Sequence, residues 1–244
     1  MQHGLYIVDF HAHLKGPGKL DNFCPEEQQT PFFQKTVNLF DSFANFSEPF
    51  HDPFLRHMAI NHRDFMWRKL YASFGPLGVM EVIRLFKRYE AKNLIASMDR
   101  HGIDHSVVCS LEPFITNKDV LDSIEPYPDR ISMFASVSKQ SEDPVGDMEK
   151  QLATGRVSGL KIHPIVGGFA CGELYDATKE IVAIANARDL PVLIHTGHIP
   201  VDIIKGLSGC SEARYLEPLI AAFPRTRFVL AHIGWEQWRQ VLGL

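Results

Sequence analysis

The chain has 244 residues, of which 45% are hydrophobic and 22% are charged, enough to bury a sizeable core in one barrel or two small domains. Its net charge of -4 is spread along the chain without a basic stripe, which excludes a nucleic-acid-binding surface. No apolar run approaches the ~20 residues of a membrane span, and the amino terminus is too short and too acidic for a signal peptide, so we expect a cytoplasmic protein without a membrane partner.

Short runs rich in Val, Ile, Leu and Phe alternate with amphipathic stretches from about Ala91 onward, after a first such run near the amino terminus. The predicted strands cover residues 6–10, 106–111, 130–137, 158–163, 192–195 and 228–232. Residues 174–187 and 215–223 carry apolar side chains at three- and four-residue spacing, which predicts helices. Strands that alternate with helices predict a parallel α/β sheet, and we expect one domain over residues 1–244.

Residues 14–90 differ from the rest because they are long, aromatic-rich and only partly helical in pattern. We interpret them as a helical insertion, or cap, after the first strand. Such an insertion in a barrel emerges at the active-site face. Its aromatic side chains either line a substrate pocket or, as the simpler expectation, pack the insertion onto the barrel.

The four cysteines show no Cys-x-x-Cys spacing. They are Cys24, Cys109, Cys171 and Cys210. This scatter indicates neither a zinc ribbon nor a disulfide framework, so we expect reduced thiols that mostly pack.

Four predicted strands end at histidines. His11 and His13 are two residues apart at the end of the first strand, so they project from the same face; the other strand ends carry His163, His195 and His232. Any one of them could be an ordinary core histidine. In a parallel barrel, however, the carboxyl ends of all strands face one rim, so we expect these side chains to converge.

Converging neutral imidazoles are typical zinc ligands, and a catalytic zinc keeps one position open for water. The ion lowers the pKa of that water and polarises a carbonyl. We assign His11, His13 and His195 as metal ligands, and His232 as an acid or base beside the metal or as a ligand to a second one. Lys161 and His163 share a strand face and would reach the same cavity, and His198 lies in the following loop, where substrates are met.

At these residues the chain resembles the amidohydrolase superfamily, in the branch of aminocarboxymuconate semialdehyde decarboxylase and related metal-dependent hydrolases. The likeness covers residues 7–13, 98–104, 127–130, 159–164, 190–197 and 223–234. It implies a (β/α) TIM-like barrel with one divalent ion, zinc or alternatively manganese. The ligands matched here are His11, His13 and His195, with His232 helping to activate water and His163 facing substrate.

The chain also departs from the pattern of the family that it resembles. The family's fourth protein ligand is an aspartate of an eighth strand, whereas only about six of eight strand–helix units are present; we expect the reading frame to continue beyond Leu244. The first and sixth strands of such an open barrel are unpaired on one side, which favours a homo-oligomer. Binuclear relatives bridge two metals with a carboxylated lysine, and Lys161 makes that arrangement the less favoured alternative.

We expect hydrolysis of an amide, ester or lactone in a small-molecule substrate. The alternative is non-oxidative decarboxylation of an aromatic or unsaturated acid, which uses the same kind of site. Some decarboxylating relatives have glutamate in place of the first histidine, and this chain keeps His11, so hydrolysis is preferred. A barrel that has lost catalysis and acts only in binding is a second alternative, but it has no physical need for the four histidines.

Overall fold

The computed structural model describes residues 4–14, 31, 90–197, 206–207 and 209–244. His198 and the predicted insertion, apart from residues 14, 31 and 90, therefore lie outside the described residues. Within the described part of the chain, no helix is long and apolar enough to cross a membrane.

Six parallel strands form one sheet in chain order, β1-β2-β3-β4-β5-β6, so the predicted incomplete (β/α) barrel is confirmed. The strands are β1 (Val8–Ala12), β2 (His105–Cys109), β3 (Ile131–Ser136), β4 (Val157–Ile162), β5 (Val192–His195) and β6 (Phe228–Ala231). Each strand pairs with its neighbours in the sequence, and among the described residues β1 and β6 are the two edges of this sheet. Homo-oligomer formation through these edges stays a prediction.

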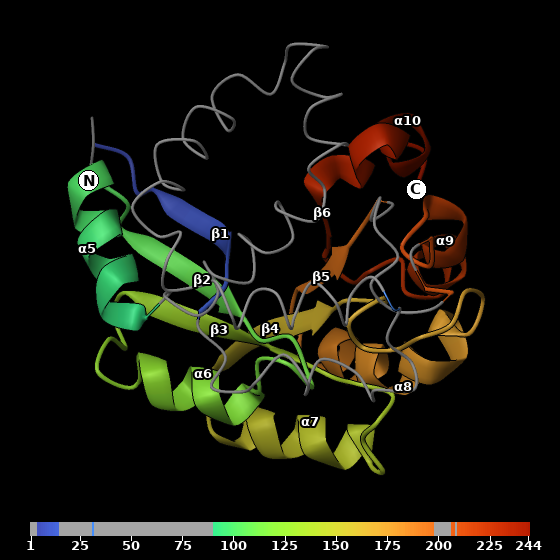
Figure 1. The fold of residues 1–244 in the computed structure, drawn as a ribbon, viewed down its shortest axis with the longest axis horizontal. Coiled ribbons are helices and arrows are strands. Elements are labelled where there is room, and N and C mark those ends of the chain that lie inside the picture. Colours follow the sequence, from blue (N-terminus) through green and yellow to red (C-terminus); the bar gives the residue numbers. More distant parts are fainter. Residues whose placement is uncertain (1–3, 15–30, 32–89, 198–205, 208) are drawn as a thin grey trace.

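Helices connect the strands and cover the outer face of the curved sheet (Figure 1). They are α5 (Ala91–His101), α6 (Asn117–Ile124), α7 (Pro144–Ala153), α8 (Leu174–Ala187) and α9 (Ala213–Ala222), followed after β6 by the 3-10 helix η3 (His232–Gln237) and α10 (Trp238–Val241). Three of them begin or end with recognisable caps. Thr116 and Asp143 accept backbone N–H bonds at the starts of α6 and α7, and Gly102 takes the left-handed conformation after α5.

The apolar core has two parts. The larger one lies between the sheet and the helices and includes Val108, Met133 and Val182. The smaller one lies on the inner face of the sheet and includes Cys109, Phe134 and Leu193. Phe134 lies directly over Gly159, where an added Cβ would come within 2.5 Å of its ring, so a glycine at this strand position lets one large ring fill the interior.

Cys171 and Cys210 form a disulfide, so the expectation of reduced thiols is wrong for this pair. Cys171 follows β4 and Cys210 precedes α9, and their separation of 39 residues hid a proximity that only the fold creates. Cys109 is free and buried, as expected, and Cys24 lies outside the described residues. Disulfides persist mainly in oxidising compartments, so this pair does not support the predicted cytoplasmic location.

Candidate active site

A β-bulge in β1 directs two consecutive residues to the inner face of the sheet. Asp9 pairs with Ser106 and Ala12 with Val108, so two residues of β1, Phe10 and His11, stand opposite one residue of β2. Phe10 contacts Phe134 edge-on with ring centroids 5.4 Å apart. The bulge thus leaves His11 and His13 on the inner face. The bulge places Asp9 on the outer face of the sheet, although strict alternation along the strand would place it on the same face as His11. The Asp9 Oδ1 atom accepts a 3.3 Å hydrogen bond from the His11 amide.

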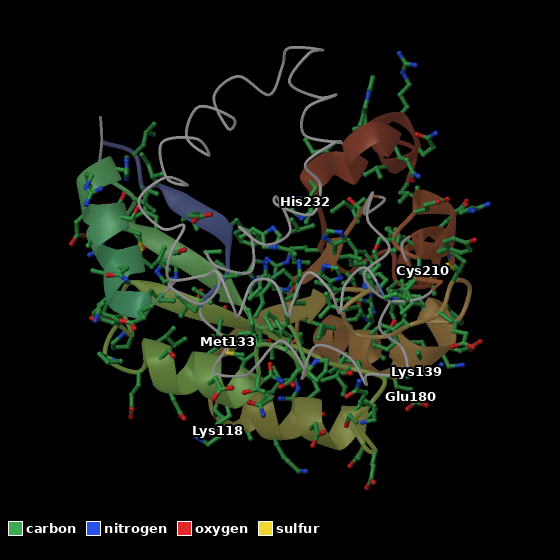
Figure 2. All side chains as sticks on the ribbon, viewed as in Figure 1. Lys118, Met133, Lys139, Glu180, Cys210 and His232 are labelled. Atoms are coloured by element: carbon green, nitrogen blue, oxygen red, sulfur yellow. A yellow bond between two sulfur atoms is a disulfide. The ribbon has the colours of Figure 1, made fainter. Side chains whose placement is uncertain are left out.

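The histidines predicted to converge do so. The Nε2 atoms of His11 and His13 are 3.0 Å apart, and the Nζ of Lys161 lies 3.0 Å from His11 Nε2. The rings of His163 and His195 stack with centroids 4.0 Å apart. In Figure 2, His232 lies at the end of β6, and its ring centroid is 4.8 Å from that of His195 and 5.2 Å from that of His11.

His232 reaches this group through an unusual backbone. Ala231 faces the inner core and pairs with His195, so continued strand geometry would turn His232 toward the helices. Instead β6 ends, and His232, Ile233 and Gly234 all have positive φ, at 65°, 50° and 68°. Such a conformation costs about 1–3 kcal/mol for a non-glycine residue, and it is most unusual for a β-branched one such as Ile233. Backbone strain of this kind is concentrated at functional sites, where it holds a side chain in an orientation that regular strand geometry would not give.

The hydrogen bonds of two histidines fix which ring nitrogen carries the proton. His13 Nδ1 donates to the carbonyl of Cys109 at 2.9 Å, because a carbonyl can only accept. The Nε2 of a neutral His13 ring therefore presents a lone pair. His163 has the opposite arrangement, since its Nδ1 accepts from the Val166 amide at 3.2 Å, and Nε2 of the neutral ring is an N–H donor.

Burial keeps these rings neutral. It lowers the pKa of His11 to about 2 and that of His13 to about 3, with Lys161 as the next cause. Burial, followed by neighbouring charged groups, also lowers the pKa values of His163, His195 and His232. The ammonium of Lys161 has a pKa lowered by burial to about 8. It is therefore the main positive charge among these neutral rings at neutral pH, and among the described residues no carboxylate forms an ion pair with it.

The donor set suits a metal ion in one respect and is incomplete in another. The Nε2 atoms of His11 and His13 are 3.0 Å apart, and two ligands that each lie about 2.0–2.1 Å from one zinc ion come to about this separation. Within the described ranges, however, no group of three or more His, Cys, Asp or Glu side chains is arranged to hold a metal ion.

The sequence predicted which residues form this site, but it did not predict the backbone features that orient their side chains. His11, His13, Lys161, His163, His195 and His232 come together, whereas His198 lies outside the described residues. The bulge at Phe10–His11 and the turn at His232 were not predicted. The one available signal for the turn was the glycine at 234, two residues after a strand-end histidine.

The chain belongs to the amidohydrolase family, whose model matches residues 48–244. Members of this family generally use divalent metal ions. No curated protein matches the sequence significantly. His11 and His13 precede the matched range, so their part in the site rests on the geometry above.

Two solved structures resemble the fold. One is a probable 2-pyrone-4,6-dicarboxylic acid hydrolase from Acinetobacter baumannii with citric acid bound, at 13% identity and a TM-score of 0.53, covering 98% of this chain and 66% of that one. The other is an uncharacterised TIM-barrel protein from Bordetella bronchiseptica, at 14% identity and a TM-score of 0.53, covering 98% of this chain and 71% of that one. At these identities the likeness establishes the TIM-barrel fold alone.

Proposed function

We propose that the chain is a metal-dependent hydrolase that cleaves an ester, lactone or amide in a small carboxylated substrate. The observation that carries this proposal is the pair of Nε2 atoms of His11 and His13, which face each other at 3.0 Å. The bond from His13 Nδ1 to Cys109 fixes the tautomer that leaves Nε2 able to bind a metal, an arrangement usual for metal-ligating histidines.

His11, His13 and His195 would hold the ion. Imidazole donors suit zinc, with manganese as the alternative. When bound, a divalent ion supplies Lewis acidity that polarises a carbonyl and makes water acidic enough to attack near neutral pH. His232, which lies beside His11 and His195, would take a proton from the attacking water and return it to the leaving group.

Lys161 and His163 would bind the substrate. The Lys161 ammonium has no carboxylate partner among the described residues, and the His163 Nε2–H is a donor of fixed orientation. Both suit a carboxylate or another anionic oxygen. The citric acid bound by the structurally similar Acinetobacter hydrolase is consistent with this chemistry, although the present chain spans only 66% of that protein.

Metal uptake tests the ligand assignment. The full 244-residue chain is loaded with zinc, desalted and analysed for metal; we expect one zinc per chain. His13→Ala should lose it. His105→Ala is the matched control, because His105 bonds Ser132 Oγ at 3.0 Å away from the cluster, and it should retain the metal. Equal zinc content in His13→Ala and the native chain would contradict the ligand set, and two zinc ions per chain would favour bridging by Lys161.

Substrate turnover tests the reaction. The zinc-loaded chain is incubated with 2-pyrone-4,6-dicarboxylic acid, a lactone with two carboxylates, and with aromatic carboxylic acids. We expect ring opening of the lactone without loss of carbon dioxide. Release of carbon dioxide from an aromatic acid would replace hydrolysis by decarboxylation.

A further inference from the structure

The orientation of His232 depends on a second contact from the neighbouring strand. Thr196 directly follows His195 at the end of β5 and is 1% exposed. Its Oγ1 donates to the carbonyl of Ala231, immediately before the turn, and accepts from the amide of Gly234, at 2.9 Å, immediately after it. One hydroxyl thus joins the two ends of the segment that contains His232 and Ile233.

Both sides of this turn are held in place. On the β5 side, the amide of Gly197 donates to the Ser211 carbonyl at 3.0 Å, and Ser211 adjoins the disulfide-bonded Cys210. On the other side, Gly234 lies so close to α10 that an added Cβ would come within 2.4 Å of Val241 Cγ2. The turn is therefore clamped between the Thr196 hydroxyl and α10.

The hydroxyl is what Thr196 contributes to the turn. Ala231 is the last paired residue of β6 and Gly234 lies beyond the end of the strand; the Ala231 carbonyl and the Gly234 amide are both bonded to this one side chain. A valine of the same shape would fill the same volume but could bond neither group. The left-handed backbone at His232 and Ile233 would then lose the contact that holds its two ends together.

We propose that Thr196 is the positioning residue for His232. Through its paired hydrogen bonds it holds the left-handed turn that directs the His232 ring toward His195 and His11. That this orientation serves catalysis rests on the function proposed above; that Thr196 sets the orientation does not.

The structural part is tested by the nuclear Overhauser contact between the rings of His195 and His232, whose centroids are 4.8 Å apart, in the full chain with labelled histidines. Thr196→Val should lose this contact and Thr196→Ser should keep it. Thr178→Val is the matched control, because Thr178 is equally buried and its hydroxyl bonds Leu174 O within α8, away from the site. A contact that persists in Thr196→Val, or is lost in Thr178→Val as well, would overturn the proposal.

The native chain provides a measurement that does not depend on the folding of a variant. The Gly234 amide, which donates to Thr196, should be protected from hydrogen exchange. Exchange of Gly234 at the rate of an unstructured amide would overturn the proposal even if Thr196→Val could not be prepared.

Turnover of 2-pyrone-4,6-dicarboxylic acid by the zinc-loaded chain separates positioning from stability. Thr196→Val should lower kcat by about tenfold to a hundredfold while leaving KM and zinc content unchanged, and Thr196→Ser should restore kcat. In a His232→Gln background, Thr196→Val should have no further effect on kcat. Additive losses would overturn the proposal. If the native chain does not hydrolyse the lactone, the proposed function fails on this substrate, and the ring contact still decides the role of Thr196.

Discussion

Two polar clusters lie at the carboxyl ends of the strands, and they are built in opposite ways. After β2 and β3, Ser110, Asn117 and Ser136 form a network without a metal-binding group. Asn117 Oδ1 accepts from Ser110 Oγ at 2.6 Å and from the Ser136 amide at 3.0 Å, and its Nδ2 donates to the Ser136 carbonyl at 2.9 Å. After β1, β4, β5 and β6 lies the histidine cluster.

The difference lies in how each cluster satisfies its polar groups. In the serine–asparagine network each donor meets an acceptor from the protein itself, so the network fastens α6 to the sheet without a ligand. In the histidine cluster, the Lys161 cation lies beside rings that burial keeps neutral, and it lacks a carboxylate partner among the described residues. A region whose polar or charged groups lower the stability of the fold is typical of a binding site. Four predictions test this contrast, from the largest expected effect to the smallest.

The largest effect should be the loss of stability in acid. The pKa of His13 is lowered from 6.5 to about 3 in the folded chain, so below pH 6.5 the unfolded chain binds more protons than the folded one. Stability therefore falls as pH decreases through the window from 6.5 toward 3. His13 alone should cost about 2 kcal/mol between pH 6.5 and 4.5. His11, His163 and His195 act in the same direction.

Urea unfolding of the metal-free chain at several pH values measures this loss. His13→Gln should flatten the acid dependence of the unfolding free energy, whereas His101→Gln, at the exposed end of α5, should not. An acid dependence that His13→Gln leaves unchanged would show that these rings are not held neutral by the fold.

The next largest effect should come from loss of the disulfide, which lies near the histidine cluster and has no counterpart in the serine–asparagine network. The Cys171–Cys210 bond closes a loop with a sequence separation of 39, and a loop of this size gains about 2–4 kcal/mol from chain entropy in the unfolded state. The double variant Cys171→Ser/Cys210→Ser should lose this amount in urea unfolding. A reductant should destabilise the native chain by a similar amount and leave the double variant unaffected; equal sensitivity of the two would count against the bond.

A smaller effect is expected from the serine–asparagine network. Asn117→Ala should destabilise the chain by about 2–3 kcal/mol, because it leaves buried groups of Ser110 and Ser136 without partners. Zinc content should not change. The control on the same helix is Ser123→Ala, whose exposed hydroxyl bonds the Asp119 carbonyl and whose loss should cost less than ~0.5 kcal/mol. Loss of zinc in Asn117→Ala would mean that the two clusters are not independent.

The same contrast explains how far the sequence alone could lead. Strands and crossover helices were predictable because their apolar periodicity is local, and the helix at 174–187 has the bounds expected. His163, His195 and His232 were predictable as a group because each follows an apolar run, and parallel strands end at one rim.

What could not be predicted depends on contacts between distant segments. The bulge that places both Phe10 and His11 on the inner face of the sheet depends on the pairing of β1 with β2. The turn at His232 is held by Thr196, 36 residues earlier in the sequence. The Ser110–Asn117–Ser136 network joins residues that have no distinctive pattern in the sequence. In each case, the partner becomes a neighbour only after the sheet has formed.

The smallest net effect is expected at Lys161, and it tests the contrast most directly. Its pKa is lowered from 10.5 to about 8 by burial, so between these values the unfolded chain binds more protons than the folded one. Stability of the native chain should therefore rise with pH across this window, by at most about 3 kcal/mol. Lys161→Met removes the buried charge but also the bond to His11, so at pH 7 we expect a net stabilisation of only about 1 kcal/mol.

Urea unfolding from pH 7 to 10.5 measures both chains, with Lys139→Met, at an exposed ion pair with Glu173, as the control. The advantage of Lys161→Met should shrink as pH rises, because the native lysine then loses its charge. A variant that is less stable at pH 7, with a deficit independent of pH, would show that Lys161 supports the fold in the way Asn117 does. A more stable variant that binds the dicarboxylate less tightly would show the reverse: that the chain keeps a destabilising cation because its substrate requires it.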